Sequence, residues 1–457
     1  MRVRRNRSRS VEMRLAFSTV CSILALLVAG SSPAAFAQEL RRVLAPGAPP
    51  TQATEAVRDP WLSTDGRHVV FVSASPNFTA SGLLQVFRYS LDSGELRLLS
   101  RNVSTGVAAD AASFAPVVSA DGRYTVFEST ATNLGPIGSG SQLFRAEVAG
   151  AVRRVSESPG GAPGNEASRH PALSADGRHV AFHTLASNLL AADGNGLADI
   201  VLKDLETGAT ELINRTASGG FGNASAQPLT PQAMSADARF VVFSTAASDT
   251  VAGGINTFGV AQVYLRDRSA GTTRLLSRNG SGEAANGTSD QASISADGRY
   301  VVFRSVASNL GATGSRLFVV DTEGGTLQNI PLPQASDFSP PLAASAAICR
   351  EGRISNAGDV LMICNLLSGQ PAQVFRWRRS GGAFQLLSRG LDSPSTLGNA
   401  QSGSRIAQTP DGTSWVFESQ ASNLVAGDSN AITDVFYASP LPTPSSEPIF
   451  RNGFEPL

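Results

Sequence analysis

The chain has 457 residues, and its 37 basic side chains balance its 37 acidic ones. Only 16% of the residues are charged, and 44 Gly and 25 Pro indicate a turn-rich chain with β-type composition rather than a disordered one. No basic cluster occurs beyond the first 37 residues, so we expect no nucleic-acid partner.

Residues 1–37 have the order of a secretory signal peptide. Six arginines precede an apolar segment at residues 15–30, and Ala35-Phe36-Ala37 provides a small-x-small cleavage site. The alternative is a retained membrane anchor, but about 16 apolar residues are short for a span. We therefore expect cleavage after Ala37 and export to the periplasm or beyond. The mature protein is expected to be a monomer without a membrane span.

A repeated turn organises the rest of the chain. Its clearest copy is residues 295–303, Ser-Ala-Asp-Gly-Arg-Tyr-Val-Val-Phe. Asp-Gly between apolar runs is a strong hairpin signal, because glycine adopts positive φ without steric cost. The Asp position recurs seven times at intervals of 54–61 residues, at Asp65, Asp121, Asp176, Asp237, Asp297, Ala357 and Asp411.

Each copy predicts four short strands, which we name A to D. Strand A precedes the turn, as in residues 171–174, and strand B follows it with an apolar anchor such as Phe71. Strand C has the pattern of residues 85–89, and strand D that of residues 96–101. No segment of helical periodicity competes with this pattern. Four antiparallel strands repeated seven times are the signature of a β-propeller.

The last copy has no strand D, because a Pro/Ser-rich segment follows Tyr437. The missing strand is found at the other end of the chain, where residues 39–44 match residues 95–100. A propeller ring must close, or its last blade exposes unpaired edges. We therefore predict an all-β, seven-bladed β-propeller of four-stranded antiparallel blades over residues 38–440. The mature N-terminal strand closes the last blade, and residues 441–457 form a tail.

Residues 119–129, Ser-Ala-Asp-Gly-Arg-Tyr-Thr-Val-Phe-Glu-Ser, combine this turn with an apolar strand that ends in Phe and Ser. In this the repeats resemble the TolB-type, WD40-like propeller repeats of exported bacterial proteins. The resemblance covers about residues 39–438 and implies the fold. TolB itself has six blades and a separate N-terminal domain, for which this chain has no room. Its role in an envelope complex is therefore not carried over.

Two loops share the pattern Asp-x-Asn-x-x-x-Asp, in which alternating oxygen ligands can wrap calcium. The candidate ligands are Asp193, Asn195, Asp199, Asp428, Asn430 and Asp434. Neither loop has the bidentate acid of an EF-hand, and Asp and Asn also stabilise turns through local backbone hydrogen bonds. Calcium is the one cofactor considered, with structural turns as the alternative.

Two further pairs are expected on A–B hairpins. His170 is expected to lie opposite His183, as a metal-binding pair or as packed histidines. Cys349 and Cys364 suggest a disulfide, since the chain is expected to be exported. The register of the other copies places these two Cα atoms on a diagonal, about 7–8 Å apart, slightly too far for a bridge. A two-residue slip would bring them together, so the pairing stays open.

The sequence contains no Gly-x-Ser-x-Gly elbow, phosphate loop, His-Glu-x-x-His or Cys-x-x-Cys, and no catalytic residue is assigned. The B–C and D–A loops vary most between copies and share one face, where function on a rigid scaffold usually lies. We predict a binding or scaffold module that engages a protein or glycan of the cell envelope through this face. The alternative is an enzyme, a lyase or hydrolase of extracellular polymers, whose site at the channel mouth would gather acids, Arg and His.

Overall fold

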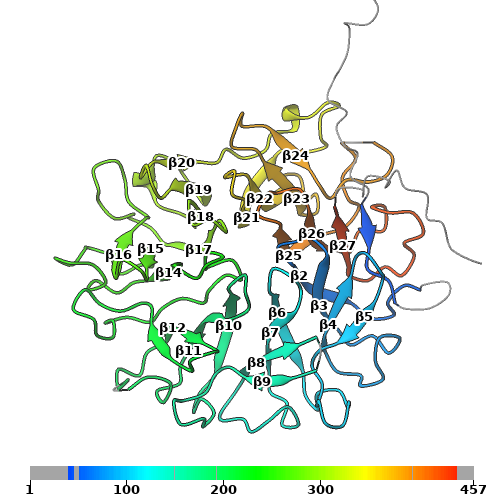
Figure 1. Ribbon diagram of the computed structural model, residues 1–457. Coiled ribbons are helices and arrows are strands. Elements are labelled where there is room, and N and C mark those ends of the chain that lie inside the picture. The colour runs from blue at the N-terminus through cyan, green and yellow to red at the C-terminus, as the bar shows by residue number, and fades with distance from the viewer. Residues whose placement is uncertain (1–39, 46–50, 149, 192, 394, 440–457) are drawn as a thin grey trace, which may run out of the picture. The chain divides into compact units, whose positions relative to one another are not determined.

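Seven antiparallel sheets follow one another along the chain and surround a common centre (Figure 1). The computed structural model describes residues 40–439 except 46–50, 149, 192 and 394. These residues belong to one compact unit, Leu40–Ser439. The predicted signal peptide and the tail beyond residue 440 lie outside the described residues. The fold of the compact unit is the predicted seven-bladed β-propeller.

In six blades the strands follow one another in chain order from the centre outward, and in blade 7 the outermost strand is β1. Blade 1 contains β2 (Val57–Leu62), β3 (His68–Ser73), β4 (Gln85–Ser90) and β5 (Leu96–Leu98). Blade 2 contains β6 (Ser113–Val118), β7 (Tyr124–Ser129), β8 (Gln142–Glu147) and β9 (Val152–Arg154). Blade 3 contains β10 (Ser168–Leu173), β11 (His179–Thr184), β12 (Asp199–Asp204) and β13 (Thr210–Leu212).

The second half follows the same plan. Blade 4 contains β14 (Phe240–Thr245), β15 (Gln262–Asp267) and β16 (Thr272–Leu275). Blade 5 contains β17 (Ser289–Ile294), β18 (Tyr300–Ser305), β19 (Arg316–Asp321) and β20 (Leu327–Asn329). Blade 6 contains β21 (Ala346–Ile354), β22 (Val360–Leu366), β23 (Gln373–Trp377) and β24 (Phe384–Leu386). Blade 7 contains β25 (Ser402–Gln408), β26 (Trp415–Ser419), β27 (Asp434–Ala438) and β1 (Arg41–Arg42).

The ring closes as predicted. The strand β1 pairs antiparallel with β27, so Arg41 lies opposite Tyr437 and Arg42 opposite Phe436. The backbone N–H of Val43 continues the ladder by donating to the carbonyl of Val435 at 3.0 Å. Val43 is fully buried, so the N-terminal segment contributes both hydrogen bonds and core to the last blade.

Blade 4 departs from the common plan, because its sheet has three strands instead of four. The segment in the place of strand A makes only isolated bridges, between Ala226 and Thr245 and between Met234 and Val241. Pro228 and Pro231 lie between these bridges. Proline cannot donate to a ladder, and two of them within four residues prevent a regular strand.

The repeated turn has a structural role that joins neighbouring blades. In the first copy, the hydroxyl of Ser63 donates to Asp65 and accepts the backbone N–H of His68, which fixes the hairpin. The backbone N–H of Asp65 then donates to the carbonyl of Ala120 in the next turn, at 3.0 Å. The same kind of bond runs from Ala120 to Ala175 and onward around the ring.

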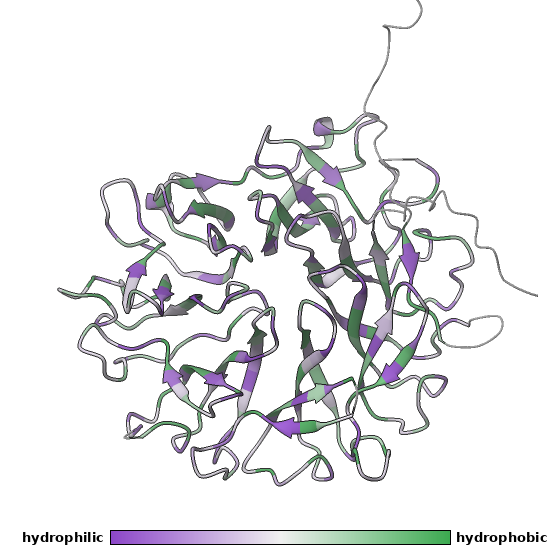
Figure 2. Ribbon diagram, in the orientation of Figure 1, coloured by the Kyte–Doolittle hydropathy of each residue, from purple (hydrophilic) through white to green (hydrophobic). Residues whose placement is uncertain are grey.

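The core is built from the anchors of strands B and C. In five blades these anchors form stacked aromatic pairs, with ring centroids 5.4–6.2 Å apart, as for Phe71 and Phe87. Figure 2 shows hydrophobic residues concentrated on the inner strands of the blades, with hydrophilic segments along the outer ones. Both faces of strand B are buried, as its apolar sequence predicts.

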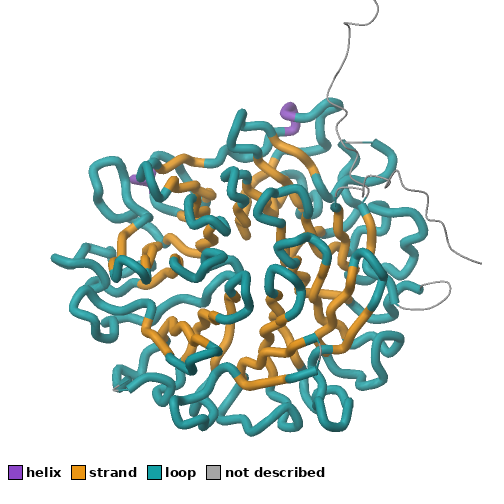
Figure 3. The backbone as a smooth tube through the Cα atoms, viewed as in Figure 1, coloured by secondary structure: helices purple, strands orange, loops and turns teal. Residues whose placement is uncertain are grey.

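Helix is limited, within the described ranges, to two single 3-10 turns, η1 (Ser308–Leu310) and η2 (Ala335–Asp337) (Figure 3). No helix in this part of the chain has the length and apolar character needed to cross a membrane.

Candidate site at the mouth of the ring

The innermost strands carry an irregularity at the same place in most blades. The pairing of strands A and B shifts there, and one residue of strand A adopts a left-handed conformation with φ between 50° and 56° in five blades. These residues are Asp59, Ala115, His170, Gln291 and Glu351. This conformation is uncommon outside glycine and marks positions that deserve a functional explanation. The bulges lie toward the B–C and D–A loops.

Two buried glutamates hold these bulges across blade boundaries. Glu128 of β7 accepts the backbone N–H of His170 at 2.7 Å, and so joins blade 2 to blade 3. Glu418 of β26 accepts the backbone N–H of Asp59 at 2.9 Å, and so joins blade 7 to blade 1. Both glutamates directly follow the aromatic anchor of strand B. In both contacts a glutamate of strand B accepts the N–H of the bulge residue in the next blade.

The environment of both carboxyl groups favours their neutral form. Burial raises the pKa of Glu128 to about 7, against the opposing effect of the hydrogen bond from His170. Burial raises the pKa of Glu418 to about 7 in the same way. Each group therefore exchanges a proton near neutral pH, the range in which a carboxyl group can act as a general acid or base.

An ion pair lies among these groups. Arg405 of β25 contacts Asp59 with a distance of 3.4 Å between Nε and Oδ1. The positive charge of Arg405 lowers the pKa of Glu128, Glu418 and His170, so it acts on all three. The residues joined in this way form what we call the mouth cluster, which comprises Asp59, Glu128, His170, His183, Arg405 and Glu418.

The two histidines of the cluster lie side by side, with ring centroids 6.2 Å apart. The predicted register is wrong by one residue, because Arg169 and not His170 lies opposite His183. The bulge at His170 causes this shift. Burial, His183 and two arginines lower the pKa of His170 to about 4, so it is neutral at pH 7. Within the described residues, no group of three or more His, Cys, Asp or Glu side chains is arranged to hold a metal ion.

Two exposed arginines border the cluster. Arg58 and Arg169 occupy the same position of strand A, one residue before the bulge, in blades 1 and 3. Among the described residues, neither guanidinium forms a hydrogen bond or an ion pair, whereas Arg304 in blade 5 is paired twice with Asp290. A cavity of about 280 Å³ opens beside Arg58 and Glu418. The mouth therefore offers free positive charge next to protonatable carboxyl groups.

The opposite end of the inner strands is packed. Arg353 of β21 is 1% exposed, donates to Glu351 at 3.0 Å and lies 5.8 Å from the ring of Trp61. Gln232 donates to the carbonyl of Ile354 and accepts its backbone N–H. These contacts tie blades 1, 4 and 6 together near the repeated turns.

A larger hollow lies elsewhere. It has a volume of about 1020 Å³ and is formed by the outer parts of blades 4 and 5, with Leu275, Leu310 and Leu327 in its wall. Its lining includes Arg274 and Arg278 but no acidic residue and no histidine. The hollow therefore lacks acid–base groups, and the mouth cluster is the better candidate for chemistry.

The six predicted calcium ligands belong to the two loops in which the sequence places them, one leading into β12 of blade 3 and one leading into β27 of blade 7. Asp199 and Asp434 are the first residues of these strands, and both are buried. In blade 7, Arg42 contacts Asp428 at 2.7 Å and Asp434 at 3.3 Å. An arginine thus already contacts both aspartates of the second loop.

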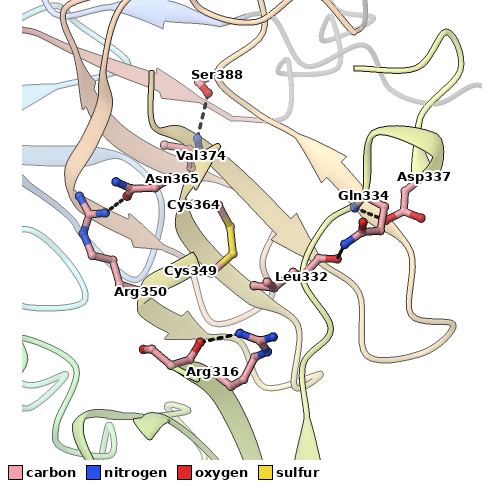
Figure 4. Close-up of a disulfide and its surroundings, with 11 residues drawn as sticks. Arg316, Leu332, Gln334, Asp337, Cys349, Arg350, Cys364, Asn365, Val374 and Ser388 are labelled. Carbon is pink, nitrogen blue, oxygen red and sulfur yellow. Dashed lines mark hydrogen bonds between the residues drawn. A yellow bond between two sulfur atoms is a disulfide. The ribbon is translucent and has the colours of Figure 1, made fainter. Parts of the chain in front are cut away.

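Cys349 and Cys364 are joined by a disulfide, and their Cα atoms are 4.1 Å apart (Figure 4). The expected diagonal register is wrong, because the two cysteines lie directly opposite each other on β21 and β22. The A–B turn of blade 6 is one residue shorter than the others, and the bulge at Glu351 adds a second residue of slip. In blades 2, 3, 5 and 7 a hydroxyl–hydroxyl bond, such as Ser113 to Ser129, links the corresponding ends of strands A and B.

The two glutamates of the mouth cluster were missed by sequence reasoning, although they leave a signal. The residue after the strand B anchor differs in every other copy, being Val72, His183, Ser244, Arg304 and Cys364. A charged residue directly after two buried apolar residues of a strand is informative, and Glu128 and Glu418 are two such cases.

No protein-family model matches the sequence, and no curated protein matches it. Among solved structures, an oligogalacturonate lyase in complex with manganese is similar at 14% identity and a TM-score of 0.50, covering 90% of this chain and 95% of that one. The β-propeller domain of the Trilobed protease from Pyrococcus furiosus, described as having an open velcro topology, matches at 12% identity and a TM-score of 0.50. That match covers 85% of this chain and 94% of that one.

A putative TolB from Agrobacterium tumefaciens also matches, at 15% identity and a TM-score of 0.38, covering 60% of this chain and 80% of that one. The solved structures similar to this chain thus include TolB-like and other propeller proteins. At these identities the likeness concerns the fold alone. Unlike the protease domain with its open velcro, this ring is closed by β1.

Proposed function

We propose that the protein is an exported propeller that binds a carboxylate-bearing glycan at the mouth of the ring. The carrying observation is the pair of exposed arginines, Arg58 and Arg169, on matching positions of two inner strands. A guanidinium presents a rigid fork of donors that suits a carboxylate. Glycan hydroxyl groups would find further partners in the cavity beside Arg58, whose lining includes Gln401, Ser404 and Gln420.

Export is part of the same proposal. It is supported by the signal-peptide pattern of residues 1–37 and by the Cys349–Cys364 disulfide, because disulfides persist in oxidising compartments. An acidic polysaccharide of the envelope or the surroundings is a ligand that such a compartment offers.

The test is binding of the mature protein to acidic and neutral polysaccharides by calorimetric titration. Polygalacturonate, alginate and hyaluronate are the acidic probes, and dextran is the neutral one. We expect binding of at least one acidic probe, weakened by salt, since exposed charges are screened. Arg58→Ala and Arg169→Ala should each weaken it about 10- to 100-fold, as expected for one hydrogen bond to a charged group.

Arg67→Ala is the matched control, because Arg67 lies next to the repeated turn, on the opposite face, and is 67% exposed. It should bind as the unchanged protein does. Equal affinity of all three variants, or no affinity for any acidic probe, would reject the proposal. Binding of an envelope protein in place of any glycan would support the alternative that the partner is a protein.

A second candidate function is an enzyme that cleaves such a glycan, either a lyase or a hydrolase. It is favoured by Glu128 and Glu418, two carboxyl groups with pKa values near 7 in the same cluster as Arg405. Cleavage would produce new reducing ends, and elimination would also produce an unsaturated product that absorbs ultraviolet light. Glu128→Gln and Glu418→Gln preserve size and the acceptor oxygen, so loss of turnover with unchanged glycan binding would identify chemistry. Absence of any product would leave binding alone.

A further inference from the structure

The loops before β12 and β27 are built alike down to single hydrogen bonds. Asn195 donates to the carbonyl of Gly222 at 3.3 Å and accepts the backbone N–H of Leu197. Asn430 donates to the carbonyl of Ala53 at 3.2 Å and accepts the backbone N–H of Ile432. The two loops therefore hold their two aspartates in matching places, so the surroundings of the two pairs can be compared directly.

In blade 7 an arginine of the same chain contacts the aspartate pair. Arg42 of β1 contacts both carboxylates with the same nitrogen, Nη1, at 2.7 Å from Asp428 and 3.3 Å from Asp434. The side chains of all three residues are at most 7% exposed. Two carboxylates that contact one nitrogen lie close enough together to hold one cation between them.

In blade 3 the same place on the outer strand holds an apolar residue. Arg42 lies opposite Phe436 on β27, and the corresponding partner of Val201 on β12 is Leu212. Burial raises the pKa of Asp199 to about 6, the hydrogen bond from Asn214 lowers it, and the charge of Asp193 raises it further, while no positive side chain lowers it. The two aspartates of blade 3 therefore repel each other as those of blade 7 do, but no arginine of the described residues lies between them.

Asp199 is also incompletely bonded. It is 2% exposed, and its Oδ1 accepts the amide of Asn214 at 2.8 Å. Its Oδ2 is buried and has no hydrogen-bond partner among the described residues. Oδ1 of Asp434 in blade 7 is unpartnered in the same way, but there the other oxygen of the carboxylate lies 3.3 Å from Arg42, whereas Asp199 has no arginine contact of this kind in the described part of the chain. Four other blades place a glutamine at this position, and its amide donates to loop carbonyls, as Gln85 does to Ala109 at 2.9 Å. A carboxylate in place of that amide faces the loop as an acceptor and needs a positive partner.

We propose that the loop Asp193–Asp199 of blade 3 binds one hard divalent cation, calcium, between the carboxylates of Asp193 and Asp199. Calcium takes six to eight oxygen ligands in flexible geometry and completes them with carbonyls and water. The cation supplies positive charge between the two aspartates of blade 3, as Arg42 does in blade 7. No cation is proposed for blade 7, because the guanidinium fills that role.

The experiment uses the mature chain, stripped of metal with a chelator and titrated with CaCl2 alone, with MgCl2 as a parallel arm. We expect one calcium per chain by calorimetry and a rise in Tm of about 3 °C at a hundredfold excess over Kd. Magnesium should bind more weakly, because it demands a stricter octahedral geometry. If the parent protein, without substitutions, shows neither heat nor a Tm shift with calcium, the proposal is overturned.

The repeats provide matched variants. Asp199→Asn should lose both the heat and the Tm shift. Leu212→Arg places an arginine in blade 3 where Arg42 stands in blade 7. This variant should fold and should lose the calcium response. Its Tm should be no lower than that of the calcium-free parent. Asp249→Asn, in a loop of blade 4, should respond to calcium like the parent. A Leu212→Arg variant that keeps the full calcium response would place the cation elsewhere and refute the assignment.

Discussion

Arg42→Leu removes the guanidinium that lies between Asp428 and Asp434 in blade 7. The three side chains are at most 7% exposed, so the substitution leaves two buried carboxylates without their cation. Breaking a buried ion pair by removing one partner costs about 3–5 kcal/mol. We expect a loss of this size at pH 8, because the leucine restores none of the lost charge balance.

The loss should depend on pH. Burial raises the pKa of Asp434 to about 6, against the opposing charge of Arg42. Because this value lies above the unfolded value of about 4, folding takes up a proton between these limits, and stability falls as the pH rises through them. Removing Arg42 disfavours the ionised form further and raises this pKa. The deficit of the variant should therefore be largest above pH 6 and shrink toward pH 4.

Denaturant unfolding followed by circular dichroism at pH 8 and pH 5 measures both effects. Arg97→Leu on β5 is the control, because its ion pair with Glu95 is about half exposed, at 45% and 46%. An exposed pair of this kind should cost less than about 1 kcal/mol at either pH. A deficit for Arg42→Leu no larger than that of the control, or equal at both pH values, would refute the reasoning.

Three further outcomes are expected. Replacing Cys349 and Cys364 together by Ser should lower stability by about 3 kcal/mol, as for a loop of about 15 residues, and a reductant should lower the Tm of the parent but not of the variant. Deleting residues 38–45 should lower the Tm sharply, because β27 loses its partner, whereas deleting residues 440–457 should leave it unchanged; equal effects would contradict the closure. Glu418→Gln should stabilise the protein by about 1–3 kcal/mol at pH 8 and little at pH 5. The sign follows because the raised pKa of Glu418 makes its ionised form unfavourable in the fold; greater destabilisation at pH 8 than at pH 5 would contradict it.

The regular parts of the fold could be predicted because they are encoded locally. The Ser-x-Asp-Gly turn fixes itself through contacts within a few residues, such as those of Ser63 with Asp65 and His68. The match of residues 39–44 to residues 95–100 then predicted which segment closes the ring. Blade 4 shows the limit of this reasoning, since its turn is present while two prolines remove its inner strand.

The positions of the site residues could not be predicted in the same way. The expected register of His170 and His183 was wrong because a bulge in strand A shifts the pairing. The expected register of Cys349 and Cys364 was wrong because a shorter A–B turn adds to such a bulge. Contacts between blades stabilise a bulge. At His170, for example, Glu128 of the neighbouring blade accepts the backbone N–H of the bulged residue. Such a contact joins residues 42 positions apart, which no short-range pattern records.

By itself, the sequence determined the number of blades, the order of their strands and the segment that closes the ring. These features repeat, and each depends on apolar periodicity and turn chemistry within one copy. Only the tertiary structure decided that Arg42 contacts one aspartate pair while an apolar residue, Leu212, takes its place beside the other. The two loops are alike in sequence, and they differ in what the outer strand of each blade places beside them.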